Sequence, residues 1–163
     1  MDAKITGELF IKSLGQIIRK EISPKEKIPV LLELLISVCR TAIQNTGIQF
    51  HTVFSIIAYA GHQYNLPGRL LFNIHRFRRQ GSFILSAEMD ETKMESLYLL
   101  GLKVISDLIR IIYQAVPTPE ILQQIPPDKI YLQREDKVTQ FKKYQRVLAV
   151  EKEVVNVQVL HIF

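Results

Sequence analysis

The segment ESLYLLGLKVISDLIRIIY, Glu95–Tyr113, decides the fold class. Its apolar residues recur at spacings of three and four, which is the period of a helix that buries one face. This stripe consists of Leu97, Leu100, Val104, Leu108, Ile111 and Ile112. The pattern predicts a long helix over about 88–116, which Pro117 and Pro119 end because proline removes a backbone donor.

Similar periodicity precedes this segment. It predicts helices over about 3–22, 24–45, 49–64 and 67–80, and one short helical turn in TPEILQQ, Thr118–Gln124. Ser23, Pro24 and Glu26 have the pattern of a capping box, and Gly47 and Gly81 have the positions of helix-ending glycines. Short connections between such helices favour a mainly α protein, a compact bundle of about five helices.

The pattern changes after IPPD, Ile125–Asp128. The run EVVNVQVLHIF, Glu153–Phe163, alternates apolar and polar residues and predicts a short C-terminal β-hairpin together with RVLAV. We therefore predict a helical bundle domain over 1–125 and an extended or β segment over 126–163. This segment is expected to begin a further domain of a larger protein, and the alternative is that the hairpin packs on the bundle.

The positive charge is concentrated in one third of the chain. No Asp or Glu occurs between Glu33 and Glu88, although this stretch contains five arginines and three of the four histidines. These five arginines account for the whole net charge of +5, because the other 16 basic residues equal the 16 acids in number. Charge concentrated in this way favours an anionic partner.

The predicted helix over 67–80 carries most of this charge. Its residues expected to contact nucleic-acid phosphates are Arg69, Asn73, His75, Arg76, Arg78 and Arg79. Arginine forks match phosphate oxygens, and Tyr64, Phe72 or Phe83 could stack on an unpaired base if exposed. The interpretation without a ligand is that arginines in a last helical turn complement the helix dipole. It accounts for Arg78 and Arg79 better than for Arg69 and Arg76.

No pattern in the sequence indicates catalysis. The G-x-S-x-G, G-x-x-x-x-G-K-[ST] and G-x-G-x-x-G motifs do not occur, so no nucleophile elbow or nucleotide cofactor site is predicted. The spacing of Cys39 and the histidines matches no metal motif. His62 and His75 are expected to be semi-buried and hydrogen-bonded, and Cys39 to be a buried thiol. The single cysteine and the absence of a membrane-spanning apolar run predict a cytoplasmic protein.

A family resemblance points in the same direction as the charge. The run FHTVFSIIAYAGHQYNLPGRLLFNIHRFRR, Phe50–Arg79, resembles the helical N-terminal extension of certain bacterial superfamily-one helicases. These are large ATP-driven proteins that process DNA or RNA. Their motor motifs are absent here, so the resemblance implies a motor beyond Phe163 and no ATPase residue in this chain.

The sequence therefore predicts a non-catalytic accessory module of a nucleic-acid-processing protein. Its basic helix would contact phosphates of DNA or RNA with little base specificity. The alternative is a protein interaction module whose basic helix binds an acidic partner or its own motor domain. No membrane partner and no cofactor are predicted.

Overall fold

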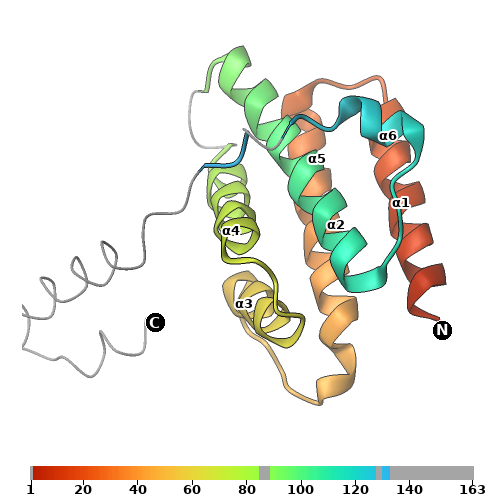
Figure 1. Cartoon of the computed structure of the whole chain (residues 1–163). Coiled ribbons are helices and arrows are strands. Elements are labelled where there is room, and N and C mark those ends of the chain that lie inside the picture. The colour runs from red at the N-terminus through yellow and green to blue at the C-terminus, as the bar shows by residue number, and fades with distance from the viewer. Residues whose placement is uncertain (1, 85–88, 128–129, 133–163) are drawn as a thin grey trace, which may run out of the picture. The chain divides into compact units, whose positions relative to one another are not determined.

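The computed structural model describes residues 2–84, 89–127 and 130–132. In these residues the chain forms six α-helices and one 3-10 helix (Figure 1). They are α1 Ala3–Arg19, α2 Pro24–Ile43, η1 Gln44–Thr46, α3 Val53–Gln63, α4 Gly68–Ser82, α5 Glu91–Tyr113 and α6 Pro119–Gln124. The predicted mainly helical fold is confirmed, and TPEILQQ forms α6. The predicted hairpin lies outside the described residues.

Helices α2 and α5 form the centre of this bundle. They pack along each other, with α1 and α6 on one side and α3 and α4 on the other (Figure 1). The side chains between them are fully buried, among them Leu31 and Leu35 of α2 and Ile105 of α5. The Tyr113 hydroxyl donates a 2.7 Å hydrogen bond to the Val38 carbonyl oxygen, which joins the end of α5 to α2.

One described helical stretch, Pro24–Thr46, is long and apolar enough to meet a length and composition criterion for a membrane span. A core helix of a soluble protein meets the same criterion. In this bundle, α2 buries Ile28, Leu31 and Leu35 completely.

The helix starts follow their capping residues. Ser23 caps α2 as predicted, because its hydroxyl accepts a 3.3 Å hydrogen bond from the Glu26 N–H. The hydroxyl of Thr52 accepts a 3.1 Å bond from the Ser55 N–H in the same way. Helix α3 therefore begins after Thr52, several residues later than the apolar spacing predicted.

Two helix ends differ from the sequence prediction. Helix α5 ends at Tyr113, before the prolines, because Gln114 adopts a left-handed backbone with φ 58°. Gly81 was interpreted as a helix stop, and this interpretation is wrong because α4 continues through it to Ser82. A Cβ atom on Gly81 would lie 2.9 Å from Cδ1 of Leu32. Glycine at this position allows α4 to approach α2 closely.

Candidate interaction surfaces of helix α4

Helix α4 packs against α2, α3 and α5 through one apolar face. Leu70, Ile74 and Phe77 are 4%, 0% and 0% exposed, so these three side chains point into the bundle, as their helical spacing favours. The polar residues of α4 lie on two other faces, and these two faces have different surroundings.

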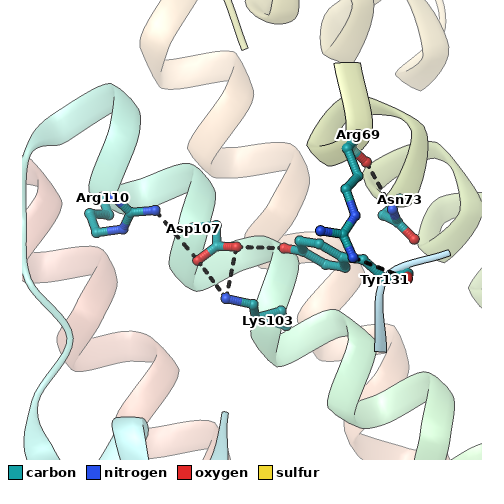
Figure 2. Close-up of polar contacts among 6 residues, drawn as sticks. All are labelled: Arg69, Asn73, Lys103, Asp107, Arg110 and Tyr131. Carbon is teal, nitrogen blue, oxygen red and sulfur yellow. Dashed lines mark hydrogen bonds and ion pairs between the residues drawn. The ribbon is translucent and has the colours of Figure 1, made fainter. Parts of the chain in front are cut away.

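The first polar face carries Arg69, Asn73 and Arg76, which we call the clamp. Spacings of four and three residues place these side chains on one side of the helix. All three contact the backbone of the segment Ile130–Leu132 (Figure 2 shows the contact of Arg69 with Tyr131). The Arg76 guanidinium donates to the Ile130 carbonyl at 2.9 Å, and the Arg69 guanidinium donates to the Tyr131 carbonyl at 3.4 Å.

Asn73 is the centre of the clamp and is 0% exposed. Its Nδ2 donates to the Leu132 carbonyl at 3.2 Å, and its Oδ1 accepts from the Leu132 N–H at 3.1 Å. The same Oδ1 accepts from Arg76 Nε at 3.1 Å, and Nδ2 also donates to the Arg69 carbonyl at 2.8 Å. The side-chain amide thus pairs with one residue of the segment as a neighbouring β-strand would.

The side chain of Tyr131 is held just as closely as the backbone around it. It is 7% exposed. Its ring lies near the Arg69 guanidinium and the Lys103 ammonium, 5.6 Å and 5.5 Å from the ring centroid (Figure 2). Its hydroxyl donates a 2.7 Å hydrogen bond to Asp107 Oδ2. Lys103 and Arg110 approach the same carboxylate at 3.1 Å and 3.8 Å.

The second polar face of α4 carries His75, Arg78 and Arg79 and meets Phe54 of α3. We call these four residues the Phe54 surface. Phe54 of α3 is 50% exposed. Its ring stacks on the His75 imidazole with centroids 4.9 Å apart and planes 29° apart. The Arg78 guanidinium carbon lies 5.7 Å from the Phe54 ring centroid, and Arg79 is exposed.

The electrostatics of the Phe54 surface are positive. Neither α3 nor α4 contains an Asp or Glu residue. Burial, followed by the charges of Arg78 and Arg79, lowers the pKa of His75 to about 4, so this imidazole is neutral at pH 7. Burial and the charge of Arg79 also lower the pKa of Arg78. Within the described residues, His75 Nδ1 and Arg78 Nε are buried and have no hydrogen-bond partner.

The structure separates the six residues predicted to contact phosphate. Arg69, Asn73 and Arg76 have partners in the segment Ile130–Leu132, whereas His75, Arg78 and Arg79 lie on the Phe54 surface. Their role in phosphate binding stays a prediction.

Among the aromatic residues, Phe54 is half-exposed although it belongs to the apolar pattern of its helix. Of the suggested stacking residues, Phe83 is 62% exposed, while the Tyr64 hydroxyl is bonded to the Ala42 carbonyl at 3.0 Å.

The remaining candidate residues have ordinary surroundings. Cys39 is 0% exposed as predicted, and burial raises the pKa of its thiol to about 12. His62 is exposed, so its predicted semi-buried position is wrong. No group of three or more His, Cys, Asp or Glu side chains that could hold a metal ion occurs within residues 2–84, 89–127 and 130–132.

Comparison of the chain with protein-family models, curated proteins and solved structures finds no match. The resemblance to helicase extensions therefore stays a prediction.

Proposed function

We propose that this helical domain is a non-catalytic accessory module of a nucleic-acid-processing protein and contacts single-stranded nucleic acid through the Phe54 surface. The observation that carries this proposal is the half-exposed Phe54 ring, which stacks on an imidazole and has a guanidinium nearby. An exposed aromatic ring offers a stacking face to an unpaired base of any sequence, and adjacent arginines offer phosphate contacts.

The surrounding charge supports the same partner. The helices that carry this surface contain no carboxylate, so no acidic side chain of α3 or α4 repels an approaching phosphate. The neutral His75 is a ring that can accept or donate one hydrogen bond. Arg69 and Arg76 do not enter the proposal, because both donate hydrogen bonds to the segment Ile130–Leu132.

An anisotropy titration with fluorescein-labelled single-stranded and duplex oligonucleotides tests the proposal. Two phosphate contacts to a single strand give a slope of about −1.4 in log K against log salt, so a fourfold rise in salt weakens binding roughly sevenfold. The double substitution Arg78→Ala/Arg79→Ala is expected to abolish binding. The matched control Lys4→Ala/Lys12→Ala removes the same charge from the exposed side of α1 and should leave most of the binding intact.

The substitution Phe54→Leu separates stacking from charge. It is expected to weaken binding of a single strand roughly tenfold, since stacking of one base on an aromatic ring contributes about 1–3 kcal/mol. Duplex binding should change little, because bases in a duplex are not available for stacking. If the folded protein binds no oligonucleotide at low salt, or if both double variants bind equally, the proposal is wrong. The first outcome would favour an acidic protein as the partner of this surface.

A further inference from the structure

A cavity of about 450 Å³ lies beside Tyr131, and helices α4, α5 and α6 supply most of its lining residues. Its volume is within the range of roughly 300–1,000 Å³ in which proteins hold small organic molecules. More than half of the lining residues are apolar, among them Ile111, Val116 and Leu122. Val116 and Leu122 are 74% and 53% exposed, so apolar surface at this cavity is left in contact with water.

The charged part of the lining is positive. Arg69, Lys103 and Arg110 line the cavity together with one carboxylate, that of Asp107. Three positive charges less one negative charge give the described lining residues a formal charge of +2. Lys103 lies 3.1 Å from Asp107, and their side chains are only 12% and 16% exposed, so these two charges offset each other (Figure 2).

Arg110 is the cation that a bound molecule can reach most easily. Its side chain is 57% exposed, and its only contact with the described residues is the 3.8 Å approach to Asp107 (Figure 2). A guanidinium group has five N–H donors in a planar fork that matches a carboxylate. The donors of Arg110 are therefore open to an anion that enters the cavity.

The lining also contains a hydroxyl group that the described contacts leave unused. Ser106 is 1% exposed, and its Oγ has no hydrogen-bond partner among residues 2–84, 89–127 and 130–132. Native proteins leave few buried polar groups unpaired. An unpaired hydroxyl in the lining of a cavity fits a site that binds a polar group.

The charge distinguishes this cavity from a second one. The second cavity, of about 820 Å³, lies at the starts of α2 and α5. Its described charged lining residues are Lys25, Glu91 and Glu95, which give a formal charge of −1. Electrostatic attraction therefore favours an anion at the cavity beside Tyr131 and disfavours one at the second cavity.

We infer that the cavity beside Tyr131 is a binding site for a small amphipathic carboxylate, an organic acid with an apolar body. The apolar body lies against Ile111, Val116 and Leu122, and the carboxylate accepts hydrogen bonds from Arg110. A single negative charge is inferred because Asp107 stays among the same cations and would repel a dianion. This inference does not depend on nucleic-acid binding, because the cavity and the Phe54 surface share no residue.

The test uses the full chain at pH 7 and the fluorescent probe anilinonaphthalene sulfonate, which is itself an amphipathic anion. Octanoate and octanol compete with the probe, and they share an apolar chain but differ in charge. Octanoate should displace the probe at a roughly threefold to fivefold lower concentration than octanol, the effect of a partly exposed ion pair. Hexanoate should require roughly tenfold more than octanoate, because it buries two fewer CH₂ groups.

Two pairs of variants link the probe to this cavity. Val116→Asp places a carboxylate in the exposed apolar wall and should weaken probe binding roughly tenfold. Ile48→Asp makes the same change at a 53% exposed position outside the cavity and should bind like the wild type. Arg110→Gln should raise the octanoate concentration required roughly threefold to fivefold and leave that of octanol unchanged. The exposed Arg40→Gln on α2 should alter neither.

The inference is overturned if octanol displaces the probe as readily as octanoate, because the cavity then does not select an anion. It is also overturned if the folded wild type binds no probe, or if Val116→Asp and Ile48→Asp bind it equally. Circular dichroism checks the helicity of each variant, and Leu122→Asp in the same wall replaces Val116→Asp if that variant does not fold. Loss of oligonucleotide binding in Arg78→Ala/Arg79→Ala would leave these results unaffected.

Discussion

The packing of α1 on α5 makes opposite predictions for two glycines of the same helix, Gly7 and Gly15, which are both buried. A Cβ atom on Gly7 would lie 2.5 Å from Cβ of Tyr113 and 2.8 Å from Cβ of Ala115. Both of these atoms are attached directly to the backbone, so neither can rotate away. Gly7→Ala therefore requires a shift of α1 or of the end of α5.

The net change in stability follows from two opposed terms. Overpacking costs about 1–3 kcal/mol, and alanine in a helix interior gains about 1 kcal/mol over glycine. We expect Gly7→Ala to lower the free energy of unfolding by about 1 kcal/mol.

In Gly15→Ala the new methyl group meets only the Arg19 guanidinium, 3.0 Å away at the end of a side chain that is 62% exposed. That side chain can move at the cost of a surface ion pair with Glu120, so Gly15→Ala should stabilise by about 0.5 kcal/mol.

Urea unfolding followed by far-ultraviolet circular dichroism measures both variants against the wild type. The two free energies of unfolding should differ by about 1.5 kcal/mol, which corresponds to roughly 3–6 °C in thermal unfolding. The substitution and the helix are the same, so helix propensity cancels in the comparison. If Gly7→Ala is as stable as Gly15→Ala, α1 does not pack on α5 at the distance described.

Three further predictions concern buried polar or titratable side chains. Asn73→Ala should lower the free energy of unfolding by about 2 kcal/mol, because it removes two hydrogen bonds to the Leu132 backbone. Gln80→Ala, an exposed position on the same helix, should change it little. Equal losses of the two variants in urea unfolding would contradict the contacts of the clamp. Cys39 should resist iodoacetamide at pH 8 in the native protein and react only on unfolding, because its pKa is about 12; rapid alkylation seen by mass spectrometry would contradict its burial. Between pH 6.5 and 4 the unfolded chain protonates the residue-75 imidazole but the native chain does not, so stability should fall as pH falls. His75→Gln should remove about 1 kcal/mol of that fall, after allowance for partial exposure; a pH profile of His75→Gln equal to that of the wild type would refute the lowered pKa of His75.

The helical fold was predictable because its signals are local. The spacing of Leu97, Leu100 and Val104 identified the buried stripe of α5, and the pattern from Ser23 to Glu26 identified the start of α2. Such signals depend on residues within one or two turns of each other.

The clamp was not predictable, because Asn73 pairs with a residue 59 positions away. A polar side chain on a helix is usually solvated, and nothing near Asn73 in the sequence indicates a buried partner. Gly81 was misinterpreted for a similar reason, since a glycine that ends a helix and a glycine that admits Leu32 of a neighbouring helix have the same local sequence. The exposure of Phe54 was not predictable because spacing defines a stripe and does not define how much of it a neighbouring helix covers.

The contacts of the clamp join side chains of α4 to backbone groups of the segment Ile130–Leu132. This difference affects how freely each residue can change in evolution. Leu132 contributes only its backbone to Asn73 and is 51% exposed, so substitutions there should be tolerated freely. Replacement of Asn73, by contrast, would leave the backbone N–H and carbonyl of Leu132 without their partner. Replacement of Tyr131 would remove the hydroxyl that donates to Asp107. Related chains should therefore keep these two residues together or lose them together, while Leu132 varies between them.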